Sequence, residues 1–371
     1  MHMLNLAVIG LLLCSITFAA VHLDRLKLPK GYKAEVLIEG VQKSRQLTTT
    51  PDEQWLFIGS YAKSIYAYHF ETKKLITLAT KLSSPIGTAY DPTTDSLIVS
   101  EIPVISVFRD IVKQLNQGKS SDFQKEKLRN YPTNEWHGAK YLGFRNGRVF
   151  VPVGSPCNHC LKDQSQFGIL SSFALQNPED YKLHAIGIRN TVGFDWHPET
   201  GKLWFSENGR DEWGNDRPGD ELNMIEDLNV TRHYGFPYCY EKDVVDPIYN
   251  KDGNCNKYVP AKYVLGPHVA VVGMTFYKGA ASQNKNIALI AEHGSWNRDI
   301  PLGYRVSMVD VSNPSADSYK IFIEGWLNLP GENDSEHAWG RPSDVLSLKD
   351  GSILISDDKA NVVYKITYVG N

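Results

Sequence analysis

Apolar and polar positions follow a unit that recurs six times along the chain. Each unit is an apolar strand, a turn rich in Asp, Pro, Gly or Asn, a second apolar strand and a polar corner. The six units begin near residues 46, 86, 140, 192, 272 and 342. Helical periodicity is nearly absent, so the pattern indicates many short strands joined by turns.

This recurrence predicts an all-β fold, a six-bladed β-propeller with four-stranded antiparallel blades. One blade cannot bury both of its faces alone, so blades stack around an axis, and each unit supplies the two inner strands of a blade. The strand-like segments 34–38 and 362–368 are expected to close the ring within one blade. A two-sheet sandwich is the structural alternative, but six repeats favour the propeller.

Residues 108–128 depart from the strand pattern. This stretch is amphipathic and rich in Lys and Gln, and we interpret it as a helical excursion between two blades.

The N-terminal segment predicts export. Residues 4–20 form an apolar run that ends in Ala19 and Ala20, and it is slightly short for a membrane span. We expect a signal peptide over 1–20 and a single propeller domain over 21–371, secreted or periplasmic, with no stable membrane insertion after cleavage. An uncleaved anchor is the alternative; a lipid anchor at Cys14 is disfavoured because no small residues precede it.

The charge of the chain excludes some partners. The net charge is −3, and no block of Lys or Arg stands out. This balance argues against nucleic acid and against anionic membrane surfaces as partners.

Four cysteines lie outside the signal segment: Cys157, Cys160, Cys239 and Cys255. An even number in an exported chain favours disulfides, and the simplest of the three possible pairings joins neighbours, Cys157 to Cys160 and Cys239 to Cys255. The first pair could instead form a thiol–disulfide redox site or half of a zinc site. No second Cys-x-x-Cys completes a metal site, and no thioredoxin-like βαβ pattern surrounds this one.

The polar corners carry the candidate chemistry. Three follow second strands, at 154–157, 207–211 and 292–298, and three precede first strands, at 136–138, 187–190 and 339–342. In a propeller the ends of the inner strands surround the channel, so these corners should converge on one pocket. Its expected lining is basic, amide and aromatic: His137, Arg189, Asn190, His293, Trp296, Asn297, Arg298 and Arg341. Such a set suits a flat, polyanionic ligand.

Several motifs run in order through these corners: RNTVGFDWHP at 189–198, FSENGRD at 205–211, DELN at 220–223, GFPYC at 235–239, GPHVA at 266–270, EHGSWNR at 292–298 and RPSDV at 341–345. Together they resemble the glucose/sorbosone dehydrogenase family, soluble sugar dehydrogenases that depend on pyrroloquinoline quinone (PQQ). The resemblance runs from about Leu28 to the C-terminus and is closest to the sorbosone/pyranose dehydrogenase branch, whose members share the Cys-x-x-Cys corner.

The resemblance implies oxidation of a sugar or sugar-like alcohol or aldehyde by hydride transfer to the quinone. His137 matches the general base, a task that suits an imidazole near its normal pKa. Arg189 matches the arginine beside the quinone C5 oxygen, where a positive charge stabilises the developing oxyanion, and Asn190 would support the same oxygen.

The resemblance also assigns cofactor contacts. The backbone carbonyls of Gly209 and Arg210 match ligands of a calcium ion whose oxygen-rich shell PQQ completes. Arg341 matches an arginine that pairs with a PQQ carboxylate, and Trp296 would form a pocket wall. His293 and Arg298 match further cofactor contacts.

Each residue has an ordinary alternative role. His137 could be a structural histidine, and Arg189 and Arg341 could be salt-bridge partners within their corners. Gly209 could serve only a tight turn, and Trp296 could be packing.

Other features extend the prediction. Asp211, Asp216 and Asp220 form an acidic loop that could hold a separate calcium ion or be solvated. The insertion 240–262 is expected to overhang the pocket and tune substrate choice. Asn229 and Asn333 begin glycosylation sequons.

The electron acceptor is expected to be external. Leu161 follows Cys160, so the chain has no Cys-x-x-Cys-His haem motif. Electrons would therefore pass to a separate acceptor such as a cytochrome or a quinone.

Two other functions are alternatives to the dehydrogenase. A calcium-dependent propeller lactonase or esterase needs Asp, Glu and Asn side chains at the channel centre, whereas these corners are rich in Arg and His. Against a non-catalytic carbohydrate-binding propeller stand His137, Arg189, Asn190 and Arg341, all present at matching positions.

Overall fold

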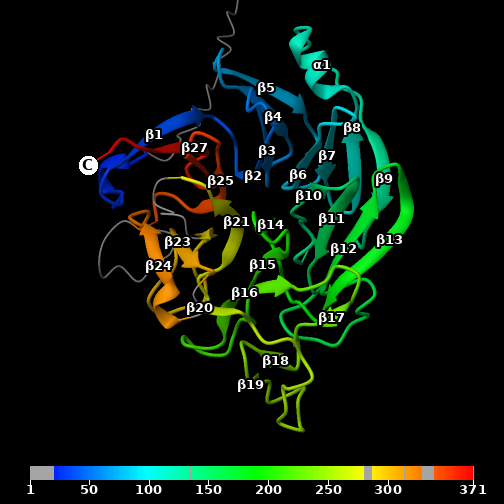
Figure 1. The fold of residues 1–371 in the computed structure, drawn as a ribbon, viewed down its shortest axis with the longest axis vertical. Coiled ribbons are helices and arrows are strands. Elements are labelled where there is room, and N and C mark those ends of the chain that lie inside the picture. Colours follow the sequence, from blue (N-terminus) through cyan, green and yellow to red (C-terminus); the bar gives the residue numbers. More distant parts are fainter. Residues whose placement is uncertain (1–20, 134–135, 280–285, 313–314, 328–337, 371) are drawn as a thin grey trace, which may run out of the picture.

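The computed structural model describes residues 21–133, 136–279, 286–312, 315–327 and 338–370. It confirms the six-bladed β-propeller, with antiparallel sheets arranged around one axis (Figure 1). The expected signal segment 1–20 and the sequon at Asn333 lie outside the described residues. Within the described ranges, no helix has the length and apolar character needed to span a membrane.

The first three blades follow the chain in order. Blade 1 is β2 (Ser44–Thr49), β3 (Trp55–Ser60), β4 (Ile65–His69) and β5 (Lys74–Ala79). Blade 2 is β6 (Thr88–Asp91), β7 (Ser96–Ser100), β8 (Val104–Phe108) and β9 (Glu126–Asn130). Blade 3 is β10 (Gly143–Arg145), β11 (Arg148–Val153), β12 (Ile169–Ala174) and β13 (Asn177–Ile186), extended by β17 (Arg232–His233), which pairs parallel to β13.

The last three blades complete the ring. Blade 4 is β14 (Phe194–Trp196), β15 (Leu203–Glu207), β16 (Gly219–Ile225) and β20 (Tyr263–Pro267). Blade 5 is β21 (Val271–Tyr277), β22 (Ile287–Glu292), β23 (Arg305–Asp310) and β24 (Tyr319–Ile323). Blade 6 is β25 (Pro342–Ser347), β26 (Ile353–Asp357), β27 (Val362–Tyr368) and β1 (Tyr32–Glu39).

The remaining elements are small. A separate two-stranded sheet is formed by β18 (Cys239–Tyr240) and β19 (Val244–Val245). One short α-helix, α1, spans Ile111–Asn116, and two 3₁₀ turns span Leu23–Arg25 and Ala316–Ser318.

Each of the six predicted units forms the first two strands of one blade. The first strands contact one another around the channel, as β2 does with both β25 and β6. The ring is closed as expected, because β1 pairs antiparallel with β27 and Tyr32 lies opposite Tyr368.

The apolar core is divided among the blade interfaces. One cluster, for example, joins Phe57 and Ile65 of blade 1 to Leu97 and Val99 of blade 2. Six such clusters exist, one at each junction between neighbouring blades. Each blade therefore buries its two faces against its two neighbours, which explains why the units must close into a ring.

Buried polar side chains join the blades near the axis. Gln46 Nε2 donates to Leu142 O at 2.5 Å, and Gln46 Oε1 accepts from the backbone N–H of Thr88 at 3.1 Å, so one residue joins blades 1, 2 and 3. Asp344 Oδ2 accepts from Leu47 N at 2.7 Å and joins blade 6 to blade 1. Because buried polar groups need partners, these bonds fix where each blade ends at the channel.

The interpretation of residues 108–128 was wrong in two respects. The helix covers only Ile111–Asn116, and it connects β8 to β9 within blade 2 rather than joining two blades. Ile111 and Leu115 are the only buried residues of the helix, and Gly118 follows with φ of 85°. Residues 126–130 then pair as a strand with β8, because that pairing satisfies the outer edge of the blade.

Candidate active site

The polar corners converge on one cavity of about 370 Å³. Its walls come from segments that enter the first strand or leave the second strand of five blades. Of the residues expected there, the cavity is lined by His137, Arg189, Asn190, Gly209, His293, Trp296 and Asn297. The lining also includes residues that the sequence analysis did not place in the pocket: Arg45, Tyr61, Asn208, Asp211, Asp220 and His268.

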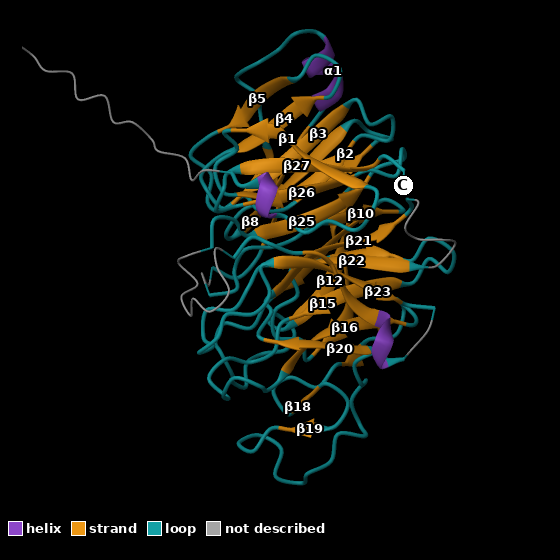
Figure 2. Ribbon diagram, turned by 90° about the vertical axis from the view of Figure 1, so that its left-hand side faces the viewer, coloured by secondary structure: helices purple, strands orange, loops and turns teal. Residues whose placement is uncertain are grey.

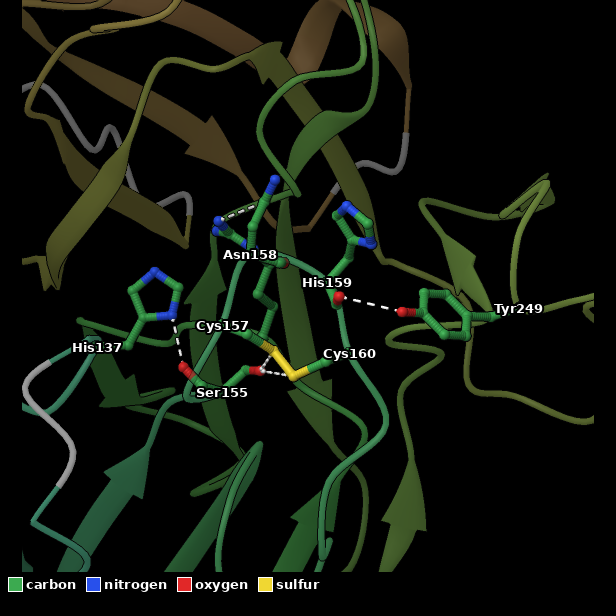
Figure 3. Close-up of a disulfide and its surroundings, with 8 residues drawn as sticks. His137, Ser155, Cys157, Asn158, His159, Cys160 and Tyr249 are labelled. Atoms are coloured by element: carbon green, nitrogen blue, oxygen red, sulfur yellow. Dashed lines mark hydrogen bonds between the residues drawn. A yellow bond between two sulfur atoms is a disulfide. The ribbon is translucent and has the colours of Figure 1, made fainter.

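His137 has one ring nitrogen fixed and the other unbonded. Its Nδ1 lies 2.9 Å from Ser155 O (Figure 3). A carbonyl oxygen only accepts, so Nδ1 carries the proton and Nε2 is the basic nitrogen. Nε2 makes no hydrogen bond to a described residue. Gly154 permits this placement, since a Cβ there would lie 2.5 Å from His137 Cβ.

The imidazole does not keep the ordinary pKa assumed from the sequence. Burial, and secondarily the charge of Arg189, lower the pKa of His137 to about 3. The ring is therefore neutral near pH 7, with an available lone pair on Nε2.

Arg189 is held rigidly at the cavity wall. Its Nη2 forms an ion pair with Asp211 Oδ2 at 2.7 Å, and its Nε donates to Asn158 O at 2.8 Å. The side chain is 3% exposed. The guanidinium is thus both a pocket residue and a salt-bridge partner, which combines the two roles that the sequence left open.

Glu207 organises the corner that carries Arg189. Its Oε1 accepts from the backbone N–H groups of Arg189 and Asn190, the latter at 3.1 Å. Its Oε2 accepts from Thr191 Oγ1 at 2.8 Å. Burial raises the pKa of Glu207 to about 7. Glu207 is the last residue of β15. The second strand of blade 4 therefore fixes the loop at 189–191 that leads into the first strand of the same blade.

The carbonyl oxygens predicted to bind calcium belong to neighbouring residues of one loop, Gly209 and Arg210. Gly209 lines the cavity, whereas Arg210 is not among its lining residues, and the Gly209 N–H donates to Asp220 Oδ1 at 2.9 Å. Neither carbonyl oxygen accepts a hydrogen bond from a described residue. Two such oxygens in one loop fit a hard cation such as calcium. The Arg210 side chain points elsewhere, into a buried ion pair with Asp246 at 2.7 Å.

Of the two alternatives for the acidic loop, the described structure does not favour a separate metal site, because its three aspartates point to different partners. Asp211 binds Arg189, while the side chain of Asp216 is 90% exposed and lies 3.8 Å from Arg298. Asp220 is buried and holds backbone N–H groups, including that of Ala270 at 2.8 Å. No three His, Cys, Asp or Glu side chains of the described segments come together as a ligand set.

His293 belongs to a charged group that closes one side of the cavity. Its Nε2 lies 2.9 Å from Asp358 Oδ1, and Arg45 forms an ion pair with the same carboxylate. Burial lowers the pKa of His293 to about 4, so the neutral ring donates its Nε2–H to Asp358. Arg45 lies inside β2 and not at a corner, so the corner motifs do not include it. The strand reads SRQLTT and is mostly polar, so the charge of Arg45 does not stand out in the sequence.

Neither Arg341 nor Arg298 lines the main cavity, and only Arg341 lines the hollow beside it. Arg341 lines an adjoining hollow that shares Arg45, Tyr61 and His293 with the cavity, and its Nε donates to His293 O at 2.9 Å. Arg298 does not line the cavity: its Nε donates to Ile300 O at 3.2 Å, and its guanidinium also bonds Asn215 O. These contacts hold the Arg298 guanidinium against Asn215 and Ile300, and its cofactor contact stays a prediction.

Trp296 forms part of the cavity wall and is 63% exposed. So large an exposed ring is not a packing residue, and it stands at the cavity opening.

Both predicted disulfides are present, Cys157–Cys160 and Cys239–Cys255. Residues 240–262, all of which the structure describes, contribute nothing to the cavity lining, so the expectation that they overhang it was wrong. The sheet of β18 and β19 projects outward from the ring (Figures 1 and 2). Asp246 of the insertion forms an ion pair with Arg210, and this contact attaches the insertion to the 208–211 loop.

Comparison with known proteins finds two matching family models and a relative that matches over nearly its whole length. The family model described as Glucose / Sorbosone dehydrogenase matches residues 160–292, and one described as TrAA12-like matches residues 244–369. A protein of Borreliella burgdorferi, described as uncharacterized, is 34% identical over 374 residues, with 96% of this chain and 95% of that protein covered.

Two solved structures share the fold. The holo form of the pyranose dehydrogenase PQQ domain from Coprinopsis cinerea aligns at a TM-score of 0.77 and 17% identity, covering 92% of this chain and 97% of that one. The calcium structure of a Trichoderma reesei carbohydrate-active enzyme of family AA12 aligns at 0.78 and 16% identity, covering 95% and 98%. With the ordered corner motifs and the six-bladed ring, the family match shows that this chain belongs to the glucose/sorbosone dehydrogenase family.

Proposed function

We propose that this protein is a PQQ- and calcium-dependent oxidoreductase that oxidises a sugar or a sugar-like alcohol or aldehyde. One observation carries the proposal. A neutral histidine with an unbonded Nε2, His137, faces a cavity whose wall also holds the guanidinium of Arg189 and the unbonded carbonyl of Gly209.

The cavity fits such a cofactor in size and polarity. Its volume of about 370 Å³ lies within the range of small-molecule sites. Two polar atoms of lining residues are buried without a partner in the described structure, Arg45 Nε and Asn297 Oδ1. Buried polar atoms are normally satisfied, so both indicate a polar ligand. Two relatives support the same choice, since one is a holo PQQ domain and another a calcium structure.

The residues divide the work of the reaction. Bound PQQ would supply the two-electron oxidant, with calcium polarising it. Nε2 of His137 accepts the hydroxyl proton of the substrate, because burial and Arg189 keep the ring neutral. Arg189, fixed by Asp211, presents positive charge where negative charge develops. Gly209 and Arg210 would hold calcium through their carbonyls, and Arg45 and Arg341 would face acidic groups of the cofactor.

The other readings have less support. A lactonase would need free carboxylates around a metal, but Asp211 is bound to Arg189 and Asp220 to backbone N–H groups. A binding module gains nothing from a buried neutral histidine whose tautomer is fixed.

We further propose that electrons leave to an external acceptor and that the protein is exported. Two disulfides support an oxidising compartment.

Reconstitution tests the proposal. Purified protein is mixed with calcium and PQQ, and dye reduction is measured with aldoses, sorbosone and simple alcohols. Activity should require both additives and fall by about 10²–10⁴-fold in His137→Ala. Arg298→Met is the matched control and should keep wild-type activity, since Arg298 does not line the cavity. If calorimetry shows no PQQ binding in the presence of calcium, the proposal is wrong.

A further inference from the structure

The Cys157–Cys160 disulfide encloses two residues, Asn158 and His159 (Figure 3), and Asn158 contacts Arg189 of the cavity wall. The same corner supplies Ser155 O, which fixes the tautomer of His137. The site described above does not account for Asn158, because it does not line the cavity.

Asn158 contacts Arg189 twice. Its backbone oxygen accepts from Arg189 Nε at 2.8 Å, and its side-chain Oδ1 accepts from Arg189 Nη2 at 3.1 Å. These two contacts fix both the position and the rotation of the guanidinium plane, because Arg donors have a rigid fork geometry.

The same side chain grips the loop that carries Gly209 and Arg210. Its Oδ1 also accepts from Asp211 N at 2.8 Å, and its Nδ2 donates to Asp211 O at 3.1 Å. The N–H and the carbonyl of Asp211 thus both bond to the side-chain amide of Asn158. A neighbouring β-strand would satisfy the same two groups with its backbone.

Only an amide of this length meets these demands. Acceptance by Oδ1 and donation by Nδ2 are both used, so the orientation of the amide is fixed by its partners. An aspartate would lack the donor, and an aliphatic residue would lack both groups. The disulfide ring prevents the segment from turning Asn158 away, and Tyr249 Oη holds the ring from outside through His159 O at 3.1 Å.

Resting on the proposed function, we propose that Asn158 is a positioning residue that locks the Arg189 guanidinium and the 208–211 loop into one arrangement. It acts through them, and so prepares the loop carbonyls and the cationic wall for calcium and PQQ before either binds.

Three variants test this in full-length protein: Asn158→Ala, Asn158→Asp and the control His159→Ala. His159 lies in the same disulfide ring, and its ring packs on Tyr249. It interacts with Arg189, Arg210 and Glu212 only through their charges and, unlike Asn158, forms no side-chain hydrogen bond with Arg189 or Asp211 in the described structure. The first readout is amide hydrogen exchange of the cofactor-free protein over 208–212, which depends on neither PQQ nor turnover. The second is the Kd of PQQ in the presence of calcium, by calorimetry.

In Asn158→Ala, exchange over 208–212 should accelerate about tenfold, because two hydrogen bonds to the loop are lost. The Kd of PQQ should rise about 10- to 100-fold, the usual range when a residue behind a metal site is removed. Asn158→Asp keeps the bonds that Oδ1 accepts and should recover PQQ binding to within about tenfold of wild type. His159→Ala should change both readouts much less than Asn158→Ala does, because it breaks no side-chain hydrogen bond to the loop.

Unchanged exchange in Asn158→Ala would overturn the inference, whatever PQQ does. Equal effects of His159→Ala and Asn158→Ala would overturn it too, because the ring alone would then matter. If exchange accelerates only in the Asn158 variants but the wild type binds no PQQ, the proposed function fails while the positioning of the loop by Asn158 is supported.

Discussion

His137 shows how its surroundings turn a common side chain into a base. Ser155 O fixes the proton on Nδ1, and burial with Arg189 disfavours the imidazolium. A base with so low a pKa is weak in water, but it is unprotonated at every pH where the protein would work.

This predicts the pH dependence of catalysis. With the pKa of His137 lowered to about 3, protonation of this residue should not reduce kcat/KM between pH 5 and pH 8. Arg189→Met removes a charge that lowers this pKa, so the pKa of His137 should rise, while burial still holds it below 6.5. The acid limb of kcat/KM should then move to higher pH in the variant.

Imidazole titration by NMR checks the same shift without turnover. Arg298→Met serves as the control and should leave the pKa of His137 unchanged, because Arg298 lies outside the cavity lining. Identical titration of His137 in the wild type and Arg189→Met would refute the assignment.

Among the elements, the two disulfides differ in what they constrain. Cys157 and Cys160 are three positions apart and shape the corner behind Arg189 and His137. Cys239 and Cys255 are 16 positions apart and close a loop that begins at β18 and includes β19. Disulfides that close longer loops remove more entropy from the unfolded chain, about 3 kcal/mol for a loop of about 15 residues.

Stability and cofactor binding should therefore separate between the two pairs. The double variant Cys239→Ser/Cys255→Ser should lower Tm more than Cys157→Ser/Cys160→Ser. The Cys157→Ser/Cys160→Ser variant should weaken PQQ binding more, because the corner that holds Asn158 is freed. Thermal unfolding and calorimetry of both proteins measure this, and the reverse ranking on either readout would contradict it.

The whole ring is cross-linked by buried carboxyl groups. Burial raises the pKa of Glu207 and Asp220 to about 7, and that of Glu221 and Asp344 to about 8. Asp344 joins blade 6 to blade 1, and Asp220 joins blade 4 to blade 5 through Ala270. The bonds between blades thus depend on groups that ionise around neutral pH.

Stability should consequently fall as pH rises from 6.5 to 8. An unfolded carboxyl group is already ionised in this range, whereas the folded one still holds its proton, so raising the pH favours unfolding. Histidines with a lowered pKa favour folding as pH rises, but only up to about 6.5; they are His137, His159, His184, His197, His233 and His293. Above that pH Lys140 opposes the trend, because burial lowers its pKa to about 8, but it is one group against four carboxyl groups.

Tm measured across this range should decline, and Asp344→Asn should make the decline shallower. Asp227→Asn, at an exposed position, is the matched control and should follow the wild type. A Tm that stays constant or rises between pH 6.5 and 8 would show that these carboxyl groups do not titrate there.

The sequence predicted features that depend on periodicity and order along the chain. The six units, the pairing of 34–38 with 362–368 and the convergence of His137, Arg189 and His293 all follow from strand alternation and the corners beside it. It failed where side-chain direction or burial decides. Arg298 sits in a matching motif yet does not line the cavity, and the pKa of His137 depends on residues brought near only by folding.

The pairing of β1 with β27 also has a consequence for synthesis. Strand β1 pairs with β27, which is synthesised last of the described strands. The sixth blade therefore cannot form until residues 362–368 have left the ribosome. Until then a nascent chain holding the other five blades exposes two apolar blade faces, one on each side of the gap. Synthesis of residues 362–368 is thus the event that seals the ring.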